Sequence, residues 1–521
     1  MVAEVDEVLV AHRHEALVQD GEPAHPRVED AHRPRIHAAI LGGDTLSVVR
    51  RRLAVLAAAL AAAASLAGGA HAAGFTARDL TIAGAGGTPL AATLYEPTDA
   101  PPAGGFPAVA MFHGLGGTRA SVDPLARQFF ADQGYVVLAF DARGHGASGG
   151  LWGLDGPNEN ADARAVYDFL AARPEVAAGK IGAFGVSLGG GAVWNSAVIG
   201  KVPWAAIAPE ATWIDLYSAL FPQNLPKSGV LAQLASLVPA SRTDPEILSR
   251  EQDAISGVDL PSLRALTSAR SVAGRLGGFT TPTLVLQGRR DFLFDVDQAR
   301  RAFAELGGPK RLYLGDFGHA PSDFATAPDL VPMSLEVRKW FDRFLKGEPN
   351  GIDKLPRVEI AKNPFTGSAQ FAAFPSPRKL VLRAGRGAWL TASGRVQRSF
   401  ALPRRRLETI GTPVVSATVS GTKPFQHLVA VLSSTSGGSE TVVSEGGIPL
   451  RPRAKPHRVS IRLLDQVVTI PAGSRLRLTL AATSTAQNPA NALYLLGVPD
   501  GSRVHLGRIS VTLPVLQKAI S

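Results

Sequence analysis

The sequence predicts an α/β domain with a mostly parallel sheet, followed by a smaller all-β domain. In the first part, apolar runs such as 107–112 and 135–140 are typical of strands buried on both faces, and helix-like segments separate them. After residue 351, short β runs are punctuated by Gly, Pro and Ser, which is typical of a sandwich or jelly roll. A chain of 521 residues can hold two such domains, which we place at 73–350 and 356–521.

The formal net charge of +10 is unevenly distributed along the chain. From Gly351 onward there are 23 Lys and Arg against 7 Asp and Glu, whereas the preceding residues hold 31 against 37. The basic charge therefore belongs to the C-terminal domain, where it could favour contact with an anionic cell surface. We expect no nucleic-acid partner, because no pattern of interleaved aromatic and basic residues accompanies the charge. The chain has no cysteine, which excludes disulfides and thiolate metal sites.

Two N-terminal segments differ from the rest of the chain. Residues 1–46 carry five of the twelve histidines without a convincing period, and we interpret them as a disordered leader. A start codon assigned too far upstream, or a metal-binding histidine cluster, is the alternative. Residues 47–72 have the order of a secretory signal peptide: Arg50-Arg51-Arg52, an apolar run, then Ala70-His71-Ala72. The sequence therefore predicts a secreted or cell-surface protein, with an uncleaved N-terminal anchor as the alternative.

The clearest functional signal is a serine in a sharp turn between a strand and a helix. Residues 181–184 are small or apolar and lead into Gly185-x-Ser187-x-Gly189. Small flanking residues leave room for a strained turn that exposes the serine hydroxyl and aims the Leu188 N–H at the reacting carbonyl oxygen. A glycine-rich loop that contains serine by chance is the alternative. The strand before the motif and the helix start at 192–197 favour a nucleophile.

A second donor to the same carbonyl oxygen is expected in the loop after the first buried strand. That strand, 107–112, ends in His113-Gly114-Leu115-Gly116-Gly117. An acyl hydrolase with a strand–turn–helix nucleophile places its second backbone donor in this loop, and we assign that role to the Leu115 N–H. We interpret His113 as a side chain that orders the loop and not as a catalytic base.

A carboxylate follows a later apolar strand. Asp291 comes just beyond the run 283–286, where the acid of a catalytic triad sits. Asp295 and Asp297 are rivals, but they fall at the start of the next helix and fit N-terminal capping charges better.

The candidate base is His319, which follows the last core strand of the domain at 310–314. Ser187, Asp291 and His319 have the chain order of the α/β-hydrolase triad. In such a triad the histidine takes the serine proton, while the aspartate holds the imidazole in the correct tautomer.

An insert of about seventy residues separates the strand 204–208 from the strand 283–286, and it predicts a helical cap at about 210–278. Trp213 and Tyr217 lie near its start, and we assign them to the substrate pocket. Ordinary core packing is the alternative for both aromatic side chains.

The same region holds the candidate acids for recognising the α-ammonium of a peptide substrate. A buried ammonium needs a partner carboxylate. Glu210, just after the strand 204–208, is the best placed, and Asp215 is second. The alternatives are that Glu210 caps the first cap helix and that Asp215 faces solvent.

Several segments carry a resemblance to a known family. Asp141 to Gly149 is similar to a D-x-R-G-x-G-x-S-x-G turn, and Trp340 to Gly347 to a closing-helix signature. The segments 379–382, 411–416 and 470–476 are similar to strand motifs of a C-terminal domain. Together they resemble the X-Pro dipeptidyl-peptidase and cocaine esterase family of serine hydrolases. This resemblance implies an α/β-hydrolase fold with a helical cap insert, followed by an all-β jelly-roll domain.

Two residues depart from the family pattern. Leu188 stands where the family usually has Tyr after the nucleophile, and the loop at Leu115 suggests a backbone donor where several members use a Tyr hydroxyl. The chain also has no large N-terminal helical domain. We therefore carry over the fold and the reaction class, and not the peptide specificity.

The sequence thus predicts an exported serine hydrolase that cleaves an ester or an amide through an acyl-enzyme. The expected partner is a small-molecule ester or a short peptide. No metal or organic cofactor is expected, because His, Asp and Glu show no ligand spacing. An X-Pro dipeptidyl-peptidase and a non-catalytic cell-surface binding protein are the alternatives.

Overall fold

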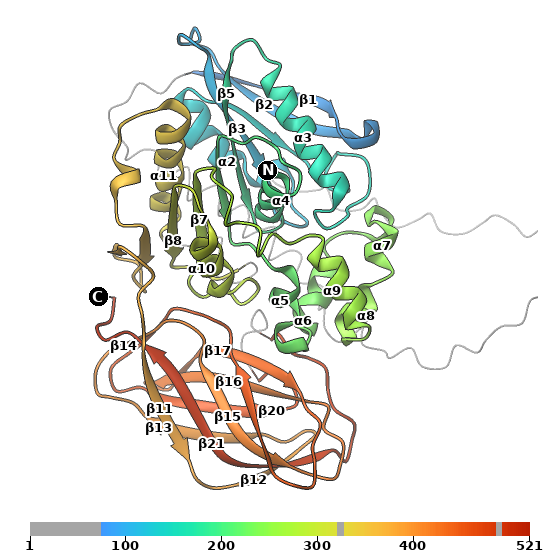
Figure 1. Cartoon of the computed structure of the whole chain (residues 1–521), viewed down its shortest axis with the longest axis vertical. Coiled ribbons are helices and arrows are strands. Elements are labelled where there is room, and N and C mark those ends of the chain that lie inside the picture. Colours follow the sequence, from blue (N-terminus) through green and yellow to red (C-terminus); the bar gives the residue numbers. More distant parts are fainter. Residues whose placement is uncertain (1–73, 320–327, 486–491, 521) are drawn as a thin grey trace, which may run out of the picture. The chain divides into compact units, whose positions relative to one another are not determined.

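The computed structural model describes residues 74–319, 328–485 and 492–520. The predicted leader and signal peptide lie outside these residues. Within the described ranges, no helix is both long and apolar enough to cross a membrane. The described chain forms a ten-stranded mixed sheet flanked by helices and two antiparallel sheets of seven and four strands (Figure 1).

The ten-stranded sheet has the order β1-β2-β4-β3-β5-β6-β7-β8-β9-β10, and the strands from β4 to β9 in that order run parallel. β3 and β4 are buried along their whole length, as the apolar runs predict. The bounds are β1 (Phe75–Ala83), β2 (Pro89–Pro97), β3 (Phe106–Phe112), β4 (Val136–Phe140), β5 (Val176–Val186), β6 (Ala206–Glu210), β7 (Thr283–Gly288), β8 (Lys310–Gly315), β9 (Val358–Ala361) and β10 (Ser368–Phe371).

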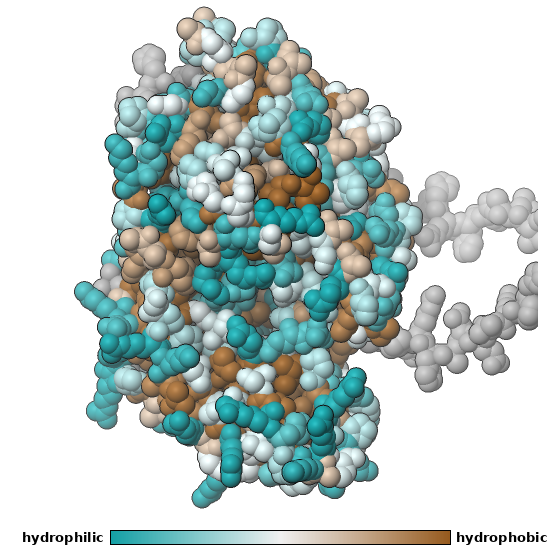
Figure 2. All heavy atoms as spheres, viewed as in Figure 1, coloured by the Kyte–Doolittle hydropathy of each residue, from teal (hydrophilic) through white to brown (hydrophobic). Residues whose placement is uncertain are grey.

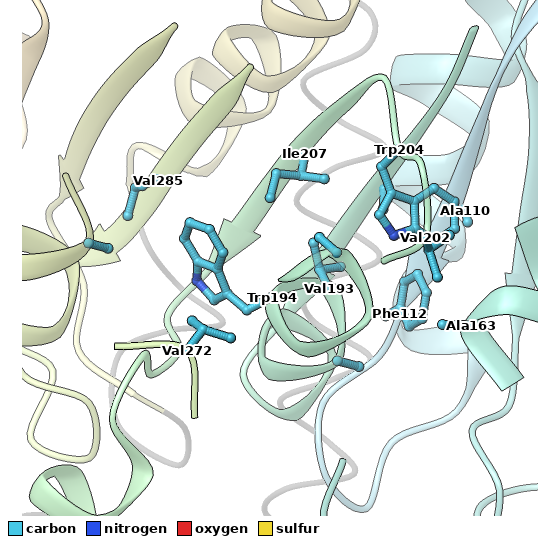
Figure 3. Packing of buried hydrophobic residues seen from close by; sticks show 14 of the residues in the cluster. Ala110, Phe112, Ala163, Val193, Trp194, Val202, Trp204, Ile207, Val272 and Val285 are labelled. Carbon is cyan, nitrogen blue, oxygen red and sulfur yellow. The ribbon is translucent and has the colours of Figure 1, made fainter. Parts of the chain in front are cut away.

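Helices cover both faces of this sheet and bury two separate apolar clusters. One cluster joins the sheet to α3 (Pro157–Ala171), α4 (Leu188–Val198) and α10 (Val296–Glu305). The other joins it to short helical turns at 123–133 and to α11 (Leu330–Phe341). Figure 3 shows Val193 and Trp194 of α4 among Ile207, Val272 and Val285. The close fit of α4 against the sheet fixes the turn that precedes it.

The predicted cap is a set of short helices inserted between β6 and β7. They bury an apolar cluster together with residues from loops of the ten-stranded sheet and from the C-terminal sheets. Their bounds are α5 (Leu216–Leu220), α6 (Ser228–Ala235), α7 (Pro245–Leu248), α8 (Glu251–Ser256) and α9 (Leu260–Ser268).

The two antiparallel sheets of the C-terminal part share one apolar cluster, as expected for a sandwich. The seven-stranded sheet contains β11 (Arg378–Ala384), β12 (Ala388–Thr391), β14 (Leu407–Thr409), β15 (Val414–Ser420), β18 (His457–Arg462), β19 (Val468–Ile470) and β21 (Arg503–Val515). The four-stranded sheet contains β13 (Val396–Ala401), β16 (His427–Ser436), β17 (Ser439–Pro449) and β20 (Arg475–Ala481).

The predicted start of the sandwich at residue 356 needs a correction. β9 pairs in parallel with β8, and β10 pairs with β9, so both strands extend the ten-stranded sheet. Val358 and Ile360 are fully buried in its core. Strand composition cannot assign a strand to a sheet, because the partner is distant in the sequence. The sandwich therefore begins at β11.

A buried ion pair joins the ten-stranded sheet to the sandwich. Arg289 follows β7, and its guanidinium donates to the carboxylate of Glu408 in β14, with both side chains fully buried. Arg289 Nε also donates to the Val467 carbonyl oxygen at 2.8 Å, and the Val467 N–H donates to the Arg289 carbonyl oxygen at 2.8 Å. The sandwich thus holds the segment that leads into Asp291.

Candidate active site

Ser187 occupies a strained turn between β5 and α4. Its φ of 56° is unusual for a residue with a side chain, and the turn is possible because the residues two positions before and after it, Gly185 and Gly189, are glycines. A Cβ at Gly185 would lie 2.2 Å from the Gly189 carbonyl oxygen, and a Cβ at Gly189 would lie 2.3 Å from that of Phe112. The glycines therefore let β3, β5 and α4 pack closely around the serine.

The three residues predicted as a triad lie within hydrogen-bond distance of one another. Ser187 Oγ is 3.0 Å from Nε2 of His319, and Nδ1 of His319 is 2.8 Å from Oδ2 of Asp291. The rival acids have other partners: Asp295 accepts the Asp465 N–H, and Asp297 pairs with Arg300. This arrangement suits transfer of the serine proton to an imidazole whose other nitrogen is held by a carboxylate.

The Asp291 carboxylate is fully buried, and four hydrogen bonds hold it. Oδ1 accepts the N–H groups of Leu293 and Phe294 at 2.8 and 2.9 Å. Oδ2 accepts from Gln287 Nε2 at 2.9 Å, in addition to His319. Gln287 was not predicted, although its place at the end of β7 is a signal that could have found it. These bonds fix the carboxylate orientation toward the imidazole.

Lys227 supports the same loop from the cap. Its buried ammonium donates to the carbonyl oxygens of Phe292 and Leu293 at 2.8 and 2.9 Å. Burial lowers its pKa to about 8, and the carboxylates of Asp295, Asp291 and Glu445 act in the opposite direction. Sequence reasoning missed this residue. The only signal is a lone lysine at the start of a largely apolar helical stretch.

The loop at 113–117 lies beside Ser187. A Cβ at Gly114 would lie 3.5 Å from the Ser187 Cβ. His113 Nε2 accepts the Ala142 N–H at 2.9 Å, so its Nδ1–H donates to the Gly114 carbonyl oxygen at 2.8 Å. Burial lowers the His113 pKa to about 4, so the ring is neutral and orders the loop.

The two N–H groups predicted to bind the oxyanion belong to residues on either side of Ser187. The Leu188 N–H begins α4, and the Leu115 N–H belongs to the loop packed against the serine. Neither N–H donates a hydrogen bond to another group among the described residues. We therefore keep both N–H groups as the candidate donors to a negatively charged oxygen formed at a substrate carbonyl.

Aromatic side chains connect the cap to the candidate base. The Trp213 ring centroid is 5.2 Å from that of Phe294, which is 5.3 Å from the His319 ring. Tyr217 stacks on Phe221 at 5.2 Å in the same apolar cluster, which also includes Leu188. Trp213 and Tyr217 are both buried, and Trp213 Nε1 donates to the Arg270 carbonyl oxygen at 2.8 Å. The wall next to the base is therefore mainly apolar.

Glu210 does not join this wall. Its side chain lines a cavity of about 80 Å³ on the α11 face of the sheet, together with Val122, Leu330 and Met333. Only its backbone oxygen contacts the nucleophile, by accepting the Ser187 N–H at 2.9 Å. Burial, with a smaller effect of Asp329, raises its pKa to about 8. A carboxyl that is neutral near pH 7 is poorly suited to bind an ammonium group.

The alternatives for the two acids also need correction. Asp215, and not Glu210, caps the first cap helix, because its side chain accepts the Ser218 N–H at 3.1 Å. Asp215 also pairs with Arg301 at 3.3 Å, so it is not simply a solvated charge. The two roles depend on where the cap helix begins, which the sequence did not locate. Among the described residues, no group of three His, Asp or Glu side chains is arranged to hold a metal ion.

Comparisons with known proteins agree with this fold. Residues 86–321 match the family model of the X-Pro dipeptidyl-peptidases, S15 family. Cocaine esterase of a Rhodococcus species is 26% identical over 281 residues, which cover 44% of this chain and 48% of the esterase. A putative Xaa-Pro dipeptidyl-peptidase of Streptomyces avermitilis is 23% identical over 267 residues, which cover 45% of this chain and 37% of that protein. Both alignments span less than half of the relative.

A solved structure covers more of the chain. A CocE/NonD family hydrolase from Staphylococcus aureus superposes with a TM-score of 0.67 at 17% identity, over 85% of this chain and 94% of that one. At this identity the likeness concerns the fold. The superposed region covers both the α/β part and the all-β part of this chain. The two proteins therefore share the order of these two parts along the chain.

Proposed function

This chain is related to the X-Pro dipeptidyl-peptidases and to cocaine esterase, and from that relationship we propose that it is an exported serine hydrolase that cleaves a small ester or amide. The observation that carries the proposal is the contact of Ser187 Oγ with His319 and of His319 with Asp291. A hydrolase needs an activated nucleophile, a base and donors for the developing oxyanion, and we assign these roles to Ser187, to His319 and to the N–H groups of Leu188 and Leu115.

The proposed reaction has two halves. Ser187 Oγ attacks the substrate carbonyl carbon while His319 Nε2 takes its proton, and the Leu188 and Leu115 N–H groups bind the oxyanion. His319 then gives the proton to the leaving alcohol or amine, and an acyl-serine remains. A water molecule attacks this ester with His319 again as base, which releases the acid and restores Ser187.

The expected substrate preference is for esters with an apolar acyl or aryl group. The aromatic wall of Trp213, Phe294 and Tyr217 supports this preference. The burial of Glu210 on the other face of the sheet argues against a bound α-ammonium. A dipeptidyl-peptidase would need an ionised carboxylate in the substrate pocket, next to the α-ammonium of the peptide.

We therefore expect short-chain aryl esters to be cleaved faster than Ala-Pro or Gly-Pro anilides. The Glu210→Gln variant should lower ester turnover by less than about tenfold, because the side chain only lines a cavity behind the nucleophile. Rates on a matched panel of nitrophenyl esters and dipeptide anilides test both points. Faster anilide cleavage, lost selectively in Glu210→Gln, would establish the peptidase alternative.

Export is the second part of the proposal. The basic, apolar and small-residue order at 47–72 supports a cleaved signal peptide, with a mature N-terminus at Ala73 or Gly74. N-terminal sequencing of protein recovered from outside the cytoplasm tests this. A secreted protein that retains residues before Arg50 would contradict it.

Lys227 is expected to position the acid loop. Lys227→Met leaves the buried carbonyl oxygens of Phe292 and Leu293 without a donor, so kcat should fall about 10- to 100-fold while KM changes little. Lys310→Met is the matched control, because Lys310 also donates to a carbonyl oxygen, that of Leu306, away from Ser187.

The pH profile gives Lys227 a second, independent readout. The wild-type amine is charged below about pH 8 and loses that charge above it, because burial has lowered its pKa. A decline of kcat/KM near pH 8 is therefore expected in the wild type and in Lys310→Met, and it should be missing in Lys227→Met. An unchanged profile in Lys227→Met would refute the assigned role.

A further inference from the structure

One face of the seven-stranded sheet concentrates exposed arginines. β18, β15, β21 and the pair β11 and β12 lie side by side, and their alternate residues are buried in the sandwich core. The opposite side chains point outward and include Arg383, Arg458, Arg462, Arg503 and Trp389, which we call the arginine face. Long hydrophilic side chains also project from the sandwich in the space-filling view (Figure 2).

The register of the strands places polar groups of different kinds next to one another. Ser460 of β18 is opposite Ser416 of β15, which is opposite Ser510 of β21, which is opposite Arg383 of β11. Ser416 is 9% exposed and accepts a hydrogen bond from Arg458 Nη2 at 3.4 Å. The accessible hydroxyl groups of this row are therefore those of Ser460 and Ser510, which lead to the Arg383 guanidinium. Neighbouring strands are about 4.8 Å apart, so the row spans roughly 14 Å, which is about the length of two to three sugar rings.

Trp389 stands at one end of this face. It is 57% exposed, and it is opposite His505 in the register of β12 and β21. The Arg503 guanidinium lies 5.2 Å from the centroid of its indole ring. An exposed indole of this kind offers a flat apolar surface beside a cation.

The positive charge of the arginine face is not neutralised within the protein. None of its four arginines has a carboxylate within 4.0 Å among the described residues, and the five strands contain no Asp or Glu. On the other sheet, by contrast, Arg477 pairs with Glu440 at 2.7 Å. The guanidinium groups repel one another, and no internal carboxylate offsets this repulsion. An anionic ligand that binds to the arginine face would offset it.

We propose that the arginine face binds an acidic polysaccharide, a sugar chain that carries carboxylate groups. Guanidinium groups bind carboxylates through two parallel hydrogen bonds, serine hydroxyls can pair with sugar hydroxyls, and the Trp389 ring packs on the apolar face of a sugar. A single-stranded nucleic acid stacks its bases on several aromatic side chains, and the arginine face has one. This binding is additional to the proposed hydrolysis and uses none of its residues.

The test is calorimetric titration of the full chain with polygalacturonate, with dextran as the neutral polymer. Binding should be measurable for polygalacturonate, weaken as salt is added, and be missing for dextran. Arg383→Ser with Arg458→Ser should weaken it by about tenfold or more, and so should Trp389→Ala. The control is Arg398→Ser with Arg475→Ser, which removes the same charge from the four-stranded sheet.

Each outcome decides the proposal. Selective weakening in the arginine-face variants, with ester turnover and circular dichroism unchanged, supports it. Equal weakening in the control pair would mean that only net charge matters and would overturn it. Tighter binding of single-stranded DNA or of anionic vesicles through the same residues would also overturn it, as would no binding of polygalacturonate at low salt.

Discussion

Ser187→Ala is expected to lower kcat by about a million-fold, because members of a catalytic triad act as a unit and the residual rate comes only from substrate binding and the oxyanion donors. His319→Ala should cost about as much. Asp291→Asn should cost somewhat less, about ten-thousand-fold, through the wrong imidazole tautomer. KM should change little in all three variants.

The measurement is steady-state hydrolysis of a nitrophenyl ester, combined with labelling by a fluorophosphonate probe. Labelling should modify Ser187 in the wild type and fail in Ser187→Ala. Ser236→Ala is the matched control, because this exposed serine hydrogen-bonds only to the Gln233 carbonyl oxygen of a cap helix. Near-normal turnover in Ser187→Ala would refute the assignment of Ser187, whereas a wild type without turnover or probe labelling would favour a non-catalytic binding protein.

The second large effect concerns stability. Arg289→Met leaves the Glu408 carboxylate buried without its cation, so the free energy of unfolding should fall by about 3–5 kcal/mol. Glu408→Leu alone leaves the Arg289 guanidinium buried without its carboxylate partner, and it should lower the free energy of unfolding by a similar amount. The double variant Arg289→Met with Glu408→Leu should recover most of the loss, because two well-packed apolar side chains can replace a buried ion pair.

Denaturant unfolding of the four proteins completes this double-mutant cycle. Arg477→Met supplies a control from the same sandwich, since its pair with Glu440 is partly exposed and should contribute no more than about 1 kcal/mol. If each single variant of the buried pair unfolds like the wild type, Arg289 does not fasten the sandwich to the segment before Asp291.

The features that could be predicted from the sequence are those that depend on residues close to one another along the chain. The turn at Ser187 was predictable because Gly185 and Gly189 are required by the turn itself, and the positions of Asp291 and His319 because each follows an apolar strand. These signals lie within a few residues of the functional group. The fold class followed from the same alternation of strands and helices.

Features that depend on distant partners were not predictable in the same way. The Lys227 ammonium donates to carbonyl oxygens of two residues that come about sixty-five positions later in the sequence. No residue near Lys227 in the sequence indicates this contact. The orientation of Glu210 depends on which face of β6 receives α11. The assignment of β9 to the ten-stranded sheet likewise depends on its pairing with β8.

The contacts of the acid loop have a consequence for biosynthesis. Gln466 Nε2 lies 3.4 Å from the Asp291 carbonyl oxygen, and Val467 exchanges hydrogen bonds with Arg289. These contacts join residues that are 175 and 178 positions apart in the sequence, so the ribosome adds Gln466 and Val467 much later than the segment they support. A nascent polypeptide can therefore complete the turn at Ser187 long before the loop of Asp291 gains its final support. The loop of Asp291 thus reaches its final arrangement only after residues 466 and 467 have been synthesised and have folded against it.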